Sequence, residues 1–179
     1  QSIEGLHQLI ATIRTYPKPS IAAVEGAAAG AGFSLALSCD MVVAARDAVF
    51  LMAYSNVALS PDGGASWSLA HTLPRPLATE LLMCGDKITA ERLHALGLVN
   101  RLSNPGDALG TALQLADRLN QRAPNALASI KELLSDALTI FHKMVTKGIT
   151  CTNLFIFRFD PIHSFVELFT RSQTFLEHF

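Results

Sequence analysis

The chain has 179 residues, 50% of them apolar, and a formal net charge of −1. A chain of this length and composition can bury one sizeable core, and its length is compatible with a single domain. Lys, Arg, Asp and Glu are scattered along it, so no basic stripe could neutralise a run of phosphates, and we expect no nucleic-acid partner.

The first part of the chain predicts a helix followed by an α/β crossover. Apolar residues recur at helical spacing, at Ile3, Leu6, Leu9, Ile10 and Ile13. Pro17 and Pro19 then end the helix. Short apolar runs predict strands over residues 20–24, 41–45 and 48–52. A Gly/Ala-rich turn and a short helix over residues 33–38 connect the first two strands, which is typical of an α/β protein.

The rest of the chain is mostly helical in pattern. We expect helices over residues 64–73, 75–83, 89–97, 105–122 and 125–145. A small strand is expected over residues 98–102. The pattern over 146–161 suits either a strand or a buried connector, and a last helix is expected over 162–179.

The Gly/Ala turn carries the first functional signal. A strand that passes through Gly26, Gly30 and Gly32 into a helix exposes free backbone N–H groups where the helix dipole favours negative charge. Such a turn could hold a phosphate or stabilise the oxygen of a polarised thioester. The glycines match neither a P-loop nor G-x-G-x-x-G. Tight packing of the helix on the sheet remains an equal alternative.

The cysteines and histidines favour a reducing compartment. Cys39, Cys84 and Cys151 are odd in number and lack CxxC spacing, which argues against a disulfide framework and a zinc knuckle. Cys39 and Cys84 resemble buried small apolar residues. The six His are dispersed, so we expect no metal site. From the cysteine pattern we expect a cytoplasmic protein.

The sequence contains no convincing membrane or secretory signal. Residues 21–38 are nearly apolar, but Glu25 interrupts them and their Gly and Ala contribute little transfer energy. The chain opens without Met and without a basic n-region, so we expect no signal peptide and a start inside a longer protein.

Three blocks carry a resemblance to a known family. They are "PKPSIAAVEGAAAGAGFSLALSCDMVVAARDAVF", "LSPDGGASWSLAHTL" and "ATELLMCGDKITAERLHALGLVNRL". In order and spacing they closely resemble the crotonase superfamily of enoyl-CoA hydratases and isomerases. The resemblance is strong over about residues 9–102, looser through the two long helices and weak from residue 138.

This resemblance implies a ββα spiral core with C-terminal helices, within the α/β class. Residues 1–102 would form part of the spiral core, and residues 103–179 a helical region for trimerisation. The protein would be a homotrimer or hexamer and bind an acyl-CoA thioester, with coenzyme A as part of the substrate and no other cofactor. Family members also have an N-terminal part, with a second oxyanion N–H and most of the adenine pocket, that this chain lacks.

The resemblance also implies which groups act. The catalytic groups would be Asp62 and the backbone N–H of Ala31, which would hold the thioester oxygen. The substrate-binding residues would be Gly30, Gly32, Ser34, Tyr54, Leu59 and Trp67.

The two glutamates of the family's hydratases are replaced. Ser34 and Tyr54 occupy the matching positions. Addition of water needs a base to activate the water and an acid to protonate the α-carbon, so their loss argues against efficient hydration. Ser34 lies outside any G-x-S-x-G elbow, which argues against a hydrolase triad. Tyr54 is interpreted as pocket lining.

Asp62, in "SPDGG", matches the acidic position of isomerase-like members. One carboxylate suffices for a double-bond shift, because it can remove a proton at one carbon and return it at another. The alternative is that Asp62 caps the helix over 64–73. Met52, Leu59 and Trp67 could line an acyl pocket, although their spacing is also that of ordinary core. Glu25 is interpreted as a solvated or strand-end charge.

The sequence thus favours an enoyl-CoA isomerase. A hydratase that uses Asp62 and a water held by Tyr54, and a non-catalytic binding subunit of crotonase fold, are the alternatives.

Overall fold

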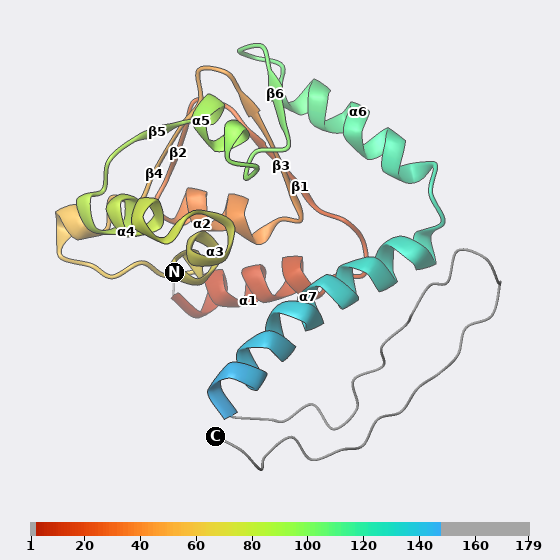
Figure 1. Cartoon of the computed structure of the whole chain (residues 1–179). Helices are drawn as coiled ribbons and strands as arrows, with labels where there is room; N and C mark the ends of the chain where they lie inside the picture. The colour runs from red at the N-terminus through yellow and green to blue at the C-terminus, as the bar shows by residue number, and fades with distance from the viewer. Residues whose placement is uncertain (1–2, 148–179) are drawn as a thin grey trace, which may run out of the picture. The chain divides into compact units, whose positions relative to one another are not determined.

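The computed structural model describes residues 3–147 (Figure 1). Residues up to Leu133 form one compact unit, and the second unit begins at Leu134. Of this second unit only the end of helix α7 (Pro124–Lys147) is described. The helix expected over 162–179 lies outside the described residues, and the boundary expected between 102 and 103 stays a prediction.

Within the described range the strands form two three-stranded sheets. One contains β1 (Ile21–Val24), β3 (Met41–Ala45) and β6 (Arg101–Ser103) in the order β1-β3-β6, all parallel. The other contains β2 (Ala27–Ala29), β4 (Val49–Leu51) and β5 (Ile88–Thr89) in the order β2-β4-β5. In it β2 and β4 are parallel, and β5 is antiparallel to β4. The predicted α/β class is confirmed.

Two strand predictions need correction. The stretch expected to be only a turn contains strand β2, whose Ala27, Ala28 and Ala29 pair with β4. Alanine has a low strand propensity, so only this pairing makes the segment extended. The strand expected over 98–102 lies at Arg101–Ser103, because the Leu98 and Val99 N–H groups instead donate to the Leu93 carbonyl and close the preceding helix.

The helices lie close to their expected positions. They are α1 (Ile3–Thr15), α2 (Ala31–Ser38), α3 (Ala65–Thr72), α4 (Arg75–Cys84), α5 (Ala90–Ala95), α6 (Ala108–Asn120) and α7, with a short 3₁₀ turn η1 (Ser55–Val57). Helix α6 starts three residues later than expected. The Glu25 carboxylate accepts hydrogen bonds from the N–H groups of Gly106 and Ala108, at 3.1 and 2.6 Å, and so caps this helix. The Glu25 carboxylate, at the end of β1, is therefore hydrogen-bonded to the start of α6.

The main core lies around helix α2, which contacts β2, α1 and α3 (Figure 1). Phe33 and Phe50 are fully buried, with ring centroids 5.0 Å apart. Small residues such as Ala28 and Ala36 are buried beside them, so the small side chains do allow close helix–sheet packing. On the other sheet, Ala112 and Leu115 of α6 pack against Val43 of β3.

A buried cation joins three parts of the first unit. The Lys131 ammonium donates to the carbonyls of Ile13 and Lys18, at 2.8 and 3.0 Å, and to the Asp40 carboxylate at 2.7 Å. Asp40 also accepts from the N–H and hydroxyl of Ser20. The start of α7 is thereby held against the end of α1 and the first strand. The neighbouring Cys39 is half-buried, but Cys84 is exposed, so its interpretation as a buried residue is wrong.

Candidate active site

The turn between β2 and α2 presents backbone N–H groups. Gly30 has φ 51° and ψ −115°, a conformation open to glycine, and its own N–H donates to the Leu51 carbonyl at 2.9 Å. Ala31 is the first residue of α2, so its N–H has no acceptor within the helix. Among the described residues no side chain caps this N-terminus, and Ala31 and Gly32 are exposed. The turn is therefore able to bind an anionic oxygen.

Tyr54 lies against this turn. A β-carbon at Gly30 would be 3.5 Å from Cζ of the Tyr54 ring and 3.7 Å from its oxygen. Tyr54 follows strand β4 and directly precedes η1. The pairing of β2 with β4 thus carries the ring to the N-terminus of α2.

The Tyr54 hydroxyl donates a hydrogen bond to Oδ1 of Asp62, with the two oxygens 2.5 Å apart. Burial, and then the hydrogen bond to Asp62, raise the pKa of Tyr54 to about 12. The phenol is therefore neutral near pH 7 and acts as a donor to the carboxylate. Sequence spacing did not reveal this contact, because the two residues are eight positions apart, across η1 and irregular chain that give no periodic signal.

The interpretation of Asp62 as a helix cap is wrong. The cap position of α3 belongs to Gly64, with φ 75°, and no side chain of the described residues caps that helix. The backbone carbonyl of Asp62, rather than its carboxylate, accepts from the Ala65 N–H at 3.2 Å. The Asp62 carboxylate instead accepts the hydrogen bond from Tyr54. Asp62 is half-buried.

Ser34 connects the two loops of the site. Its buried hydroxyl lies 3.3 Å from the Gly30 carbonyl and 3.2 Å from the Asp62 carbonyl, within hydrogen-bond distance of both. Its Cβ would be 2.9 Å from a β-carbon at Gly63. Ser34 therefore holds the Asp62 segment close to the glycine turn.

The structure separates the three apolar lining candidates. Met52 is fully buried and belongs to the core. Leu59 and Trp67 are 61% and 38% exposed, so their interpretation as ordinary core is wrong. The Trp67 ring stacks on His71, with centroids 4.4 Å apart, and the Arg14 guanidinium lies 5.1 Å from its centroid. Whether Leu59 and Trp67 line an acyl pocket stays a prediction.

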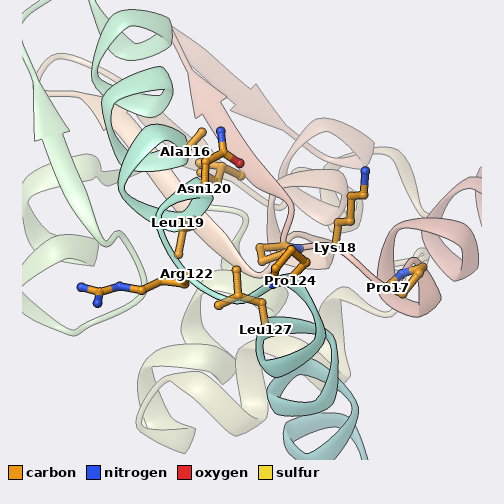
Figure 2. Close-up of a pocket in the computed structure, with 10 residues that line it drawn as sticks. Pro17, Lys18, Ala116, Leu119, Asn120, Arg122, Pro124 and Leu127 are labelled. Atoms are coloured by element: carbon orange, nitrogen blue, oxygen red, sulfur yellow. The ribbon is translucent and has the colours of Figure 1, made fainter.

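A separate pocket of about 250 Å³ lies between the end of α6, the start of α7 and the Pro17–Pro19 segment (Figure 2). Leu119, Pro124 and Leu127 form its apolar wall. Figure 2 shows the Lys18 and Arg122 side chains extending away from it in different directions. None of its lining residues belongs to the predicted site.

Within residues 3–147, no group of three His, Cys, Asp or Glu side chains is placed to hold a metal ion. None of the helices there is both long enough and apolar enough to cross a membrane.

The structure thus places the Gly30 turn, at the N-terminus of α2, beside Tyr54, which donates a hydrogen bond to the Asp62 carboxylate. The chain belongs to the enoyl-CoA hydratase/isomerase family, whose pattern it matches over residues 2–151. This confirms the predicted membership of the crotonase superfamily.

Individual relatives have different activities. The chain is 39% identical over 139 residues to a 1,2-epoxyphenylacetyl-CoA isomerase from Escherichia coli, covering 77% of this chain and 53% of the relative. It is 40% identical over 116 residues to a carnitinyl-CoA dehydratase from Salmonella arizonae, covering 65% and 44%. It thus spans about half the length of these curated relatives.

A solved structure also matches the fold. The crystal structure of an enoyl-CoA hydratase from a Polaromonas species is 65% identical, with a TM-score of 0.76. The match covers 83% of this chain and 58% of that one. The predicted crotonase-like fold is therefore confirmed.

Proposed function

We propose that the chain carries the acid–base half of an acyl-CoA isomerase, in which Asp62 shifts a proton along the acyl group. The observation that supports this most directly is the Tyr54–Asp62 hydrogen bond, beside the Gly30 turn. Through Tyr54, the Asp62 carboxylate, which does not cap α3, is connected to the N-terminus of α2, where the Ala31 N–H has no acceptor within the helix.

The proposed reaction needs one carboxylate and one oxyanion site. The Asp62 carboxylate removes a proton from the α-carbon, between the thioester and the 3,4 double bond, and the electron pair of that C–H bond delocalises onto the thioester oxygen as a dienolate. The Ala31 N–H stabilises that oxygen, a contribution typically of about 10²–10³ in rate for one such donor. Asp62 then returns the proton to a different carbon, so the double bond moves and no atom is gained or lost.

Tyr54 has a supporting role in this scheme. A neutral phenol that donates to one carboxylate oxygen fixes the direction of the other oxygen, which is then free to accept the proton. Tyr54 would thus orient the base, in addition to the lining role expected from the sequence.

The names of the relatives support two reaction classes. The Escherichia coli relative is an isomerase, which agrees with the single-carboxylate scheme. The Salmonella relative is a dehydratase and the Polaromonas structure is a hydratase, so hydration is the second candidate, with the Tyr54–Asp62 pair holding a water. The predicted acyl-CoA substrate, trimeric or hexameric assembly and cytoplasmic location are part of the same proposal.

The decisive experiment compares two substrates on the full-length protein. Incubation with a 3-enoyl-CoA should produce the 2-enoyl isomer, whereas a 2-enoyl-CoA should gain water slowly or not at all. Asp62→Asn should lower the isomerisation rate by about 10²–10⁴. Asp47→Asn, on an exposed aspartate of the β3–β4 turn, is the matched control and should retain the rate.

Other outcomes would support the alternative functions. Rapid water addition without isomerisation would support the hydratase. Acyl-CoA binding with neither reaction would support a non-catalytic subunit. Full isomerisation by Asp62→Asn would remove the base assignment.

A further inference from the structure

We infer that Arg14 is a positioning residue for Asp62: from helix α1 it holds the segment that carries the carboxylate. This inference rests on the proposed role of Asp62 as the acid and base.

Arg14 binds the start of helix α3 through several contacts. Its Nη2 donates to the hydroxyl of Ser68 at 2.8 Å, and Ser68 is only 4% exposed. Its guanidinium lies over the Trp67 ring, 5.1 Å from the centroid. The same Nη2 would be 3.6 Å from a β-carbon at Gly64, the cap residue of α3. Arg14 therefore contacts the helix whose entry segment contains Asp62.

A second residue of α1 contacts the same segment. Cδ1 of Ile10 would be 2.8 Å from a β-carbon at Gly63, so the side chain lies directly against that glycine. Ile10 and Arg14 are four residues apart and share one face of α1. The residues immediately after Asp62 thus lie against α1 at two successive glycines.

The two glycines make this external support necessary. Gly63 and Gly64 have φ values of 61° and 75°, and they have no side chains with which to restrict their own backbone. If only the hydrogen bonds to Tyr54 and Ser34 held the Asp62 segment, its backbone would be able to rotate at these two glycines. Contacts from α1 limit this motion, and a displacement of about 1 Å in a reacting group can cost about 10²-fold in rate.

Helix stability alone does not account for Arg14 at this position. A cation near a helix N-terminus is disfavoured by the helix dipole, and the first turn of α3 contains no acidic residue to offset it. The planar guanidinium is instead suited to donating to Ser68 while it stacks on Trp67, which a lysine ammonium cannot do in the same way. These contacts depend more on the planar shape of the Arg14 guanidinium than on its charge.

The test measures both catalysis and the Tyr54–Asp62 contact in the full-length protein. Arg14→Met should lower kcat for the 3-enoyl-CoA by about tenfold and change KM by less, because the role inferred for Arg14 is to position the carboxylate and not to bind the substrate. Arg14→Lys, which retains a donor for Ser68, should have an intermediate kcat. Arg46→Met, on an arginine whose ion pair with Glu91 is exposed, is the matched control and should retain both constants.

A spectroscopic titration tests the positioning independently of activity. The Tyr54 phenol is followed by its absorbance as the difference between each protein and its Tyr54→Phe counterpart. Burial and the Asp62 hydrogen bond raise the pKa of Tyr54 to about 12, so the midpoint should fall in Arg14→Met as the Asp62 contact loosens, while burial still holds it above 10. Circular dichroism verifies that the variants are folded.

The results separate the two proposals. An unchanged kcat together with an unchanged Tyr54 midpoint in Arg14→Met would overturn the positioning role, as would a raised KM with normal kcat. If the unaltered protein does not isomerise, or Asp62→Asn retains the rate, the proposed function fails. The titration still decides in that case whether Arg14 holds the Asp62 segment.

Discussion

Tyr54 and Asp62 are joined by a hydrogen bond of 2.5 Å between the phenol and the carboxylate, at the N-terminus of helix α2. Both residues lie on irregular segments, one after β4 and one before α3. The contact therefore depends on how these segments pack, and it relates the stability of the loop to its proposed chemistry.

Removing the Tyr54 hydroxyl should weaken both the stability of the loop and its proposed chemistry. We expect Tyr54→Phe to lower kcat for isomerisation by about tenfold, the size of effect expected from one hydrogen bond to a charged group. Tyr16→Phe, on an exposed tyrosine, is the control and should leave kcat unchanged. A Tyr54→Phe variant with wild-type kcat would show that Asp62 is oriented by other groups.

The raised pKa of Tyr54 also predicts a pH dependence of stability. Because the folded protein raises this pKa from 10.0 to about 12, folding favours the neutral phenol. The contribution is complete below pH 10 and is lost as the pH rises through about 12. Urea unfolding over this range should show a decline in the free energy of unfolding that is smaller in Tyr54→Phe; equal declines would contradict it.

Gly63 should be intolerant of a side chain. Gly63→Ala combines a strained φ of 61° with β-carbon distances of 2.8 Å to Ile10 and 2.9 Å to Ser34. We expect a loss of about 2–4 kcal/mol in the free energy of unfolding. Gly26→Ala is the matched control, since it has φ 63° but nothing within 4 Å of the added carbon. Its expected loss is about 1 kcal/mol, from backbone strain alone. Equal losses in the two variants would show that crowding at Gly63 is unimportant.

The cap of helix α6 by Glu25 predicts a smaller effect. Glu25→Ala removes the acceptor for the Gly106 and Ala108 N–H groups, and should lower the free energy of unfolding by about 1–2 kcal/mol. Glu91→Ala removes only an exposed ion pair with Arg46, at 3.5 Å, and should change it by about 0.5 kcal/mol or less. Chemical denaturation measures both. Equal changes in the free energy of unfolding would mean that the Glu25 cap stabilises the protein no more than an exposed ion pair does.

Lys131 offers the largest predicted change outside the site. Lys131→Met removes the donor to the Ile13 and Lys18 carbonyls and the cation beside Asp40. We expect a loss of about 3 kcal/mol, because the Asp40 charge loses its buried partner. Lys87→Met, on an exposed lysine, should be close to neutral. A thermal or urea unfolding curve for Lys131→Met that matches the unaltered protein would contradict this role.

The regular elements could be predicted where local signals are strong. Apolar spacing and the following prolines located α1, and the small glycines and alanines located the turn before α2. Strand β2 was missed because Ala27, Ala28 and Ala29 have no strand preference of their own and become extended by pairing with β4. The start of α6 was misplaced because its cap, Glu25, comes from a distant part of the chain.

By itself, the sequence predicted the α/β class and, through the three blocks that resemble a known family, the family and the two candidates Ala31 and Asp62, since these blocks can be read from the chain alone. Only the tertiary structure decided that the Asp62 carboxylate pairs with Tyr54 instead of capping α3, and that Arg14 and Ile10 lie against the following glycines. The physical reason is that glycine-rich loops have no conformational preference strong enough to orient a side chain. The direction of the carboxylate is therefore set by the packing of elements that are far apart in the sequence.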